Sequence, residues 1–180
     1  DKREYKETTS IKFKNDLINV FKDIGQEYTC LELGTNHGHT TRILSFLFKH
    51  VVTLDWREEP NLRMAKELNQ DRNNITYIEK DVYSPWSDLN LPIFQVALID
   101  CGHEYDHLVS DINNCIRYGS DSQYMIFDDY GIPGYGVKQA IHDQINNISG
   151  LNKIANIGEQ KGDEPRPGKV LLDSEGVICL

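Results

Sequence analysis

Acidic side chains recur along the sequence, each at or shortly after the end of a short apolar run. Asp55, Asp81 and Asp100 follow three such runs, and the pair Asp128-Asp129 follows a fourth. Like charges a few ångströms apart repel each other in a partly buried site, so a cluster of them needs a proton or a cation. Ligand sets made only of oxygen favour a hard ion such as Mg²⁺. The spacing therefore predicts a rim of carboxylates, part of which could hold a divalent ion.

A glycine-bearing turn between two apolar runs has the residues needed to hold a small ligand against bare backbone. Glu32 lies inside the first run, and Gly34 and Gly38 bracket the turn. Glycine allows a sharp turn and a close approach, and the helix that follows offers unpaired N–H groups at its start. Asp55 at the end of the next run is placed to accept hydrogen bonds from ribose hydroxyls. The stretch 29–56 predicts a site for a nucleoside-containing cofactor, the alternative being a tight structural turn.

The elements that must position these residues alternate between apolar runs and amphipathic helices. We expect helices over residues 11–24, 40–48, 61–69, 105–118 and 137–148, and strands over 30–33, 51–54, 75–78, 94–99, 124–127, 152–157 and 169–172, with 176–180 extending the last strand or pairing beside it. Such alternation favours a mostly parallel, doubly wound sheet. The closing strand-loop-strand predicts an antiparallel edge. We therefore expect one α/β domain over residues 1–180, with an N-terminal helical segment (1–28) and a Rossmann-like core (29–180).

Helical spacing also predicts which faces are buried. The inward residues are Phe13, Leu17, Val20, Phe21 and Ile24 in the first helix, and Leu108, Val109, Ile112 and Ile116 in the fourth. Thr9-Ser10 is expected to cap the first helix and Gly119 to end the fourth. Trp86 is interpreted as a core residue rather than a ring-stacking partner.

Composition limits the classes of partner. The chain has 180 residues and a formal net charge of −9, which disfavours nucleic acid because its binders need basic surface. No apolar run approaches the ~20 residues that span a bilayer, and the charged N-terminus shows no signal peptide. The four cysteines lack zinc spacing, which indicates reduced thiols in a cytoplasmic protein. We expect a small-molecule substrate and no membrane partner, and the oligomeric state stays open.

The run Glu32-Leu33-Gly34-Thr35-Asn36-His37-Gly38 reads E-x-G-x-x-x-G and resembles motif I of class I S-adenosylmethionine (SAM) methyltransferases. The expected series of seven strands resembles the same family over nearly the whole chain. An acid after the third strand could bond the amine of adenine while Val82 packs on the ring, although a solvated strand end explains Asp81 equally well. The resemblance implies SAM as the cofactor, bound by Glu32, Gly34, Thr35, Asn36, Gly38, Asp55, Trp56, Asp81, Val82 and Asp100.

Two further segments resemble small-molecule O-methyltransferases of the macrocin O-methyltransferase type. Residues 98–105 (LIDCGHEY) are similar to the family's "IDGDHSYE", and residues 126–130 (IFDDY) to its "(V/F)DDY". The resemblance implies that Asp100, Asp128 and Asp129 ligate a divalent metal, with Mg²⁺ expected, which binds hydroxyl oxygens of the substrate.

One departure from that family concerns the general base. The family often has a second Asp two residues after the first, and the matching position here is Gly102. His103 is the nearest alternative base, His107 is a weaker one, and Cys101 is interpreted as a packing residue.

These observations predict methyl transfer from SAM to a hydroxyl of a small molecule, with Asp100 and His103 as catalytic residues. Two alternatives remain, namely a SAM-binding protein without transfer activity and a metal-independent methyltransferase that uses the aspartates to orient its substrate. A dehydrogenase would need pyrophosphate-binding glycines that the turn lacks. Amino-methyltransferases of nucleic acids carry [N/D]-P-P-[Y/F/W] where this chain has Asp100-Cys101-Gly102-His103.

Overall fold

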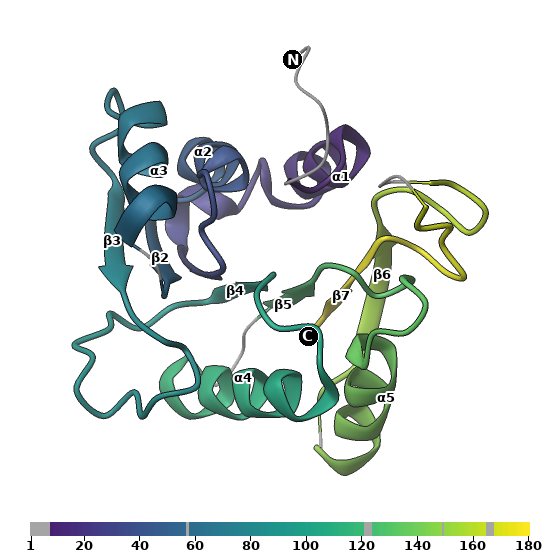
Figure 1. Ribbon diagram of the computed structural model, residues 1–180. Helices are drawn as coiled ribbons and strands as arrows, with labels where there is room; N and C mark the ends of the chain where they lie inside the picture. Colours follow the sequence, from purple (N-terminus) through teal and green to yellow (C-terminus); the bar gives the residue numbers. More distant parts are fainter. Residues whose placement is uncertain (1–7, 57, 121–123, 149, 165–167) are drawn as a thin grey trace.

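A central sheet lies between two layers of helices in the computed structural model, which describes residues 8–56, 58–120, 124–148, 150–164 and 168–180 (Figure 1). Its strands have the order β3-β2-β1-β4-β5-β7-β6. They are β1 (Thr29–Leu33), β2 (His50–Asp55), β3 (Ile75–Glu79), β4 (Val96–Ile99), β5 (Tyr124–Phe127), β6 (Lys153–Ile157) and β7 (Gly176–Cys179). Residues 1–7 of the expected N-terminal segment lie outside the described residues.

The sheet pairs in parallel from β3 through β5, and β7 runs antiparallel to both β5 and β6. This arrangement confirms the prediction of a seven-stranded, mostly parallel, doubly wound sheet with an antiparallel strand near one edge. Leu33 at the end of β1 lies level with Leu54 of β2 and Ile99 of β4. The strand order reverses between β1 and β4, and ligands of open α/β sheets bind beyond the strand ends at such a point.

Helices cover both faces of the sheet. They are α1 (Ile11–Phe21), α2 (His39–Leu47), α3 (Arg63–Leu68), α4 (Tyr105–Tyr118) and α5 (Val137–Asn147), with short turns η1 (Gly25–Glu27) and η2 (Glu58–Leu62). In Figure 1, α1, α2 and α3 lie on one side of the sheet, and α4 and α5 lie on the other. Ser10 caps α1 by accepting the backbone N–H of Phe13, and Gly119 follows α4 as its C-cap, as predicted.

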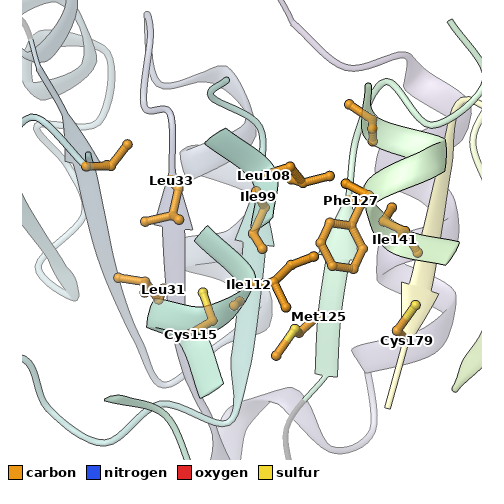
Figure 2. Packing of buried hydrophobic residues seen from close by; sticks show 14 of the residues in the cluster. Leu31, Leu33, Ile99, Leu108, Ile112, Cys115, Met125, Phe127, Ile141 and Cys179 are labelled. Carbon is orange, nitrogen blue, oxygen red and sulfur yellow. The ribbon is translucent and has the colours of Figure 1, made fainter. Parts of the chain in front are cut away.

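Alternating residues of the strands belong to two separate hydrophobic cores, because successive side chains of a strand point to opposite faces. On the α1 and α2 side, Cys30, Val51 and Leu98 pack with residues such as Phe13 and Leu17. On the other side Leu31, Leu33, Ile99, Met125 and Phe127 meet α4 and α5 through Leu108, Ile112, Cys115 and Ile141 (Figure 2). Trp86 is 1% exposed within this second core, which confirms its interpretation as a core residue.

The last strand was placed wrongly by the sequence pattern. Residues 169–172 form no strand, and β7 is formed by Gly176–Cys179, which is buried throughout. Val170 is 50% and Leu172 is 61% exposed, and Leu171 between them is buried outside the sheet. The backbone N–H of Leu172 instead bonds the carbonyl of Gly131, which holds the stretch against the loop after β5.

Helix boundaries and faces also differ in part. The first helix ends at Phe21 rather than at residue 24, because Ile24 and Gly25 enter the separate turn η1. Val20 is 36% and Ile116 is 40% exposed, so neither lies on the buried face that was predicted. In α4 the residue next to Ile116, Cys115, is fully buried instead. The expected helix 61–69 begins earlier, as the wider turn η2.

Two bulk expectations can be compared with the fold. Within the described residues, the longest and most apolar helices still fall short of what a membrane crossing requires. All four cysteines are free thiols, and Cys30, Cys115 and Cys179 are buried.

Candidate functional site

The turn after β1 brings two strand ends into direct backbone contact. Gly34 has φ of +97°, and a Cβ atom at this position would collide with the carbonyl oxygen of Asp100. Glycine adopts this conformation without strain and leaves the space that the neighbouring backbone needs. The glycine therefore allows β1 and β4 to end side by side, at the point where the strand order reverses.

The Asp55 carboxylate ties the end of β2 to the same turn. Its Oδ2 accepts the backbone N–H of Asn36 at 2.8 Å, and Nδ2 of Asn61 lies 3.3 Å from its Oδ1. Asn36 has φ of 45°, a left-handed conformation that Asn adopts more readily than most residues. One buried acid thus fixes the shape of the turn and places carboxylate oxygens beside it.

A cavity of about 470 Å³ opens in front of these strand ends. Its lining includes seven residues predicted to bind the cofactor: Gly34, Asn36, Asp55, Trp56, Asp81, Val82 and Asp100. Val82 is 6% exposed, whereas Trp56 is 62% exposed. The volume falls in the range of small-molecule and cofactor sites, roughly 300–1,000 Å³.

Other residues of this larger cavity were not predicted as cofactor contacts, among them Asn61, Lys80, Tyr83 and His107. The Lys80 ammonium lies 2.8 Å from the carboxylate of Asp88. Lys80 stands among charged residues after β3, a pattern that does not distinguish a ligand-binding residue from a solvated strand end.

A second cavity of about 280 Å³ lies over the start of α2. Thr35, Gly38, His37, His39 and Thr40 line it from the turn, and Thr8 lines it from the segment before α1. Gly34, Asn36, Asp100 and Cys101 line both cavities. Asp100 therefore lies at the boundary between the two spaces. Thr8 was missed because nothing in the sequence links it to a turn 26 residues later.

Glu32 lies beneath the turn, and it is absent from the lining of both cavities. It is 1% exposed, and its Oε2 accepts the hydroxyl groups of Thr41 and Thr53, each at 2.6 Å. Burial raises the pKa of Glu32 to about 8, although the two threonine hydrogen bonds oppose that shift. In this structure Glu32 supports the turn from below, with α2 and β2 attached to it.

Three side chains beyond β4 and β5 converge on one point. One ligand atom each from Asp100, His103 and Asp129 lies within 4.8 Å of the others. His103 Nε2 is 2.6 Å from Asp129 Oδ2, and the His103 ring stacks on Tyr135 with 4.5 Å between centroids. Asp129 is 1% exposed and has φ of 57°, a left-handed conformation. We call these three residues the Asp100–His103–Asp129 cluster.

The cluster differs from the expected ligand set of three aspartates. Asp128 is 3% exposed but is not part of this group of three. Because Asp129 adopts a left-handed conformation directly after β5, the pair Asp128-Asp129 does not present both carboxylates to the same point. The structure thus joins His103, which had been expected as a base, with two of the expected metal ligands.

Gly102 is enclosed by aromatic side chains of the larger cavity. A Cβ atom at this position would collide with the hydroxyl of Tyr83. The Tyr83 ring stacks on His107, with centroids 4.0 Å apart and 19° between the planes. The space that a side chain at position 102 would need is therefore filled by Tyr83. His107 faces this stack and the larger cavity, and it is not part of the cluster.

A buried acid lies behind Cys101. Asp111 of α4 is 0% exposed, and its Oδ2 accepts the Cys101 thiol at 3.2 Å. Burial raises the pKa of Asp111 to about 7. Burial and the neighbouring Asp111 together hold the pKa of the Cys101 thiol well above its usual range. Cys101 therefore stays a neutral thiol, which agrees with its interpretation as a packing residue.

Structural comparison places this fold among known methyltransferases. An rRNA methylase from Streptococcus thermophilus has 13% identity and a TM-score of 0.64, covering 95% of this chain and 96% of that one. A Streptococcus mutans protein described as a methyltransferase, in complex with SAH, has 14% identity, a TM-score of 0.68 and coverages of 94% and 98%. A Klebsiella pneumoniae protein described as an O-methyltransferase has 18% identity, a TM-score of 0.66 and coverages of 93% and 76%.

At these identities the structural matches establish the fold alone. No curated protein matches the sequence. A family model described as "Methyltransferase domain" matches residues 31–130, from the first apolar run to the end of IFDDY. This match covers more than half of the chain. It includes the strand ends that line the two cavities and all three residues of the cluster. The chain therefore belongs to this methyltransferase family, whose members are class I SAM-dependent enzymes.

Proposed function

We propose that SAM binds across the two cavities, with its adenosine part in the larger one and its methionine part in the smaller one. Asp55 and Asp81 supply acceptors for the ribose and for adenine, and Val82 supplies an apolar surface for the ring. The smaller cavity offers polar groups of the turn and the start of α2. The residues shared by both cavities lie where the two parts of an elongated ligand would join.

The acceptor in this proposal is a small molecule with a hydroxyl group, positioned at the Asp100–His103–Asp129 cluster. The observation that carries this assignment is the position of Asp100, which lines both cavities and also belongs to the cluster. An acceptor bound at the cluster would therefore lie next to the join of the two cavities.

SAM supplies an electrophilic methyl group, so the protein has mainly to orient the acceptor and remove its proton. His103 is the proposed proton acceptor. Asp129 is close enough to hold its ring in place and to stabilise its charged form, and Tyr135 supports the ring from one face. This arrangement of a base with an orienting carboxylate needs no side chain at position 102.

The cluster also fits a divalent metal ion. Ligand atoms about 2.1 Å from one ion lie roughly 3–4 Å apart, and the three ligand atoms here are all within 4.8 Å of one another. Because the set contains an imidazole nitrogen, it suits a first-row transition ion better than Mg²⁺, which prefers oxygen ligands. Such an ion would supply Lewis acidity toward a hydroxyl oxygen. Asp100, His103 and Asp129 would hold it, and His103 would then serve as a ligand rather than as the base.

A methyl-transfer assay with labelled SAM tests this proposal. The acceptor panel should hold catechols and sugars, each with EDTA, with EDTA followed by Mn²⁺ or Mg²⁺, and without chelator. Activity lost with EDTA and restored better by Mn²⁺ supports the metal role. Activity that ignores EDTA but disappears in His103→Ala supports the metal-independent base. SAH binding without transfer to any hydroxyl acceptor would contradict methylation of hydroxyls and would favour a SAM-binding protein.

Nucleic acid is the second candidate acceptor, because the structural matches include rRNA methylases from Streptococcus thermophilus and Clostridium thermocellum. The net charge of −9 opposes it, since phosphate backbones are bound by basic surface. Total RNA added to the same assay decides between the two classes, and incorporation into RNA alone would overturn the small-molecule proposal. We also propose a reducing compartment such as the cytoplasm, given four free thiols.

A further inference from the structure

A buried carboxylate that lines neither cavity connects three segments of the chain. Glu175, directly before β7, is 3% exposed. Its Oε1 accepts the backbone N–H of Ser10 at 2.8 Å, and its Oε2 accepts the Ser10 hydroxyl and the backbone N–H of Glu159. Its backbone carbonyl accepts the N–H of Tyr130. One residue thus joins the start of α1, the loop after β6 and the segment that carries Asp129.

The start of α1 leads from this carboxylate to the smaller cavity. Ser10 donates its hydroxyl to Glu175 and accepts the N–H of Phe13, so both its backbone and its side chain are fixed. The Thr9 hydroxyl lies 3.1 Å from the Thr40 hydroxyl, and the Thr8 hydroxyl lies 3.4 Å from the same group. Thr8 and Thr40 both line the smaller cavity.

We propose that Glu175 is a positioning residue for ligand binding. Through Ser10 it holds Thr8 and Thr9 against Thr40, so that the segment before α1 forms one wall of the smaller cavity. The inference rests on the proposed function, because it assigns this cavity to part of SAM. Ser10 donates two hydrogen bonds to this buried carboxylate, and bonds to charged acceptors are stronger than neutral ones.

The body of α1 is held independently of this attachment. Phe13, Leu17 and Phe21 are each 0% exposed in the core between α1, α2 and the sheet. Removal of the Glu175 charge should therefore leave α1 docked and loosen mainly residues 8–10, with Thr8 still bonded at 2.9 Å by Nζ of Lys14. This separation allows positioning of the wall to be distinguished from stability of the fold.

The experiment measures SAH affinity by calorimetry in Glu175→Gln, Thr8→Ala and the double variant. We expect Glu175→Gln to weaken binding about tenfold, which corresponds to loss of about one charge-assisted hydrogen bond. Because both changes act on one wall, the double variant should bind little worse than either single variant. Glu27→Gln, the same change at an exposed site beyond α1, should bind SAH like the unchanged protein. Full affinity in Glu175→Gln, or additive losses in the double variant, would overturn the proposal.

Hydrogen exchange provides a readout that does not depend on the ligand. Glu175→Gln should speed exchange at the amides of residues 10–14 and leave the strands β1 and β4 unchanged. Unchanged exchange at residues 10–14 would also overturn the proposal. If Glu175→Gln fails to fold, Ser10→Ala removes one of the same contacts and takes its place in the calorimetry, but not in hydrogen exchange, because Ser10 also caps α1. Failure of the unchanged protein to bind SAH would overturn the proposed function instead, and exchange would still test the positioning role.

Discussion

The larger cavity and the Asp100–His103–Asp129 cluster share Asp100 but are built in different ways. The larger cavity takes its polar groups from strand ends, with Asp55 at the end of β2 and Asp81 shortly after β3. The cluster depends on loops, with His103 two residues before α4 and Asp129 in a left-handed conformation. Apolar runs fix where strands end, whereas loop conformation is set by tertiary contacts. Positions at strand ends are therefore predictable from pattern, and positions in loops are not.

The largest expected effect tests the boundary between the two regions. Asp100→Asn keeps the size of the side chain but removes a charge shared by both cavities and the cluster. We expect methyl transfer to fall about 100-fold or more, as for loss of a group that acts directly on the reacting atoms. The rate of methyl transfer is measured with saturating SAM, and the affinity for SAH is measured in a separate experiment. If SAH affinity falls as far as the rate does, Asp100 serves the cofactor side alone, and the cluster loses its connection to catalysis.

Gly102→Ala tests whether the aromatic stack closes the larger cavity. The added methyl group would collide with the Tyr83 hydroxyl and press on Tyr83 and His107. We expect a loss of stability on the order of 2 kcal/mol, typical of overpacking, and weaker SAH binding. Gly102→Ala combined with Tyr83→Ala should recover part of the stability, because the colliding ring is removed. Thermal unfolding measures the change in stability. An unchanged midpoint in Gly102→Ala would mean that Tyr83 and His107 do not pack tightly against position 102.

Asp111→Asn tests the buried acid behind the larger cavity through pH. Burial raises the pKa of Asp111 to about 7 in the fold, against an ordinary value of 3.8. The folded state thus holds a proton that the unfolded state releases between about pH 4 and 7. Stability from this group is complete below pH 4 and is lost as pH rises through 7. We expect Asp111→Asn to lose less stability than the unchanged protein between pH 5 and 8, by about 1 kcal/mol or more.

Urea unfolding at both pH values measures this difference. Glu32, whose pKa is raised to about 8 by burial, contributes a dependence of the same sign in both proteins. The comparison with Asp111→Asn removes that common contribution. If the free energy of unfolding changes equally with pH in both proteins, Asp111 is not the source of the pH dependence.

The smallest effect concerns Trp56 on the rim of the larger cavity. Because Trp56 is 62% exposed, Trp56→Ala should leave stability unchanged within about 0.5 kcal/mol. SAH affinity should fall about threefold, less than for a fully buried aromatic contact. Trp86→Ala, at a residue 1% exposed, is the matched contrast and should destabilise the fold strongly. Equal SAH affinity in Trp56→Ala and the unchanged protein would remove Trp56 from the cofactor site.

Much of the fold follows from the sequence because short apolar runs and helical spacing report burial directly. The parallel strands, the Ser10 cap and the turn at Gly34 were predicted on this basis and are present. The last strand was misplaced because Leu171 is buried outside the sheet while its neighbours Val170 and Leu172 are exposed, and the sequence pattern alone does not separate this case from a strand.

The candidate site was predictable to a smaller extent. Nine of the ten residues predicted to bind the cofactor line a cavity, and the exception, Glu32, lies just beneath the turn. The acidic pair after β5 could not be resolved from sequence, because the left-handed turn at Asp129 decides which carboxylate meets Asp100. Thr8 and Glu175 act through contacts across more than 30 and 160 residues of sequence, for which no local pattern exists.

The position of β7 has a consequence for synthesis. β7 comes after β1 to β6 in the sequence, yet it lies between β5 and β6 in the sheet. On the ribosome, where chains emerge from the N-terminus, β5 has an unpaired edge until residues 176–179 have left the exit tunnel. Glu175, which anchors the segment before α1, emerges just ahead of them. The nascent chain therefore completes its sheet and the wall of the smaller cavity only after these residues have emerged, and until then it exposes a strand edge that chaperones or neighbouring chains can pair with.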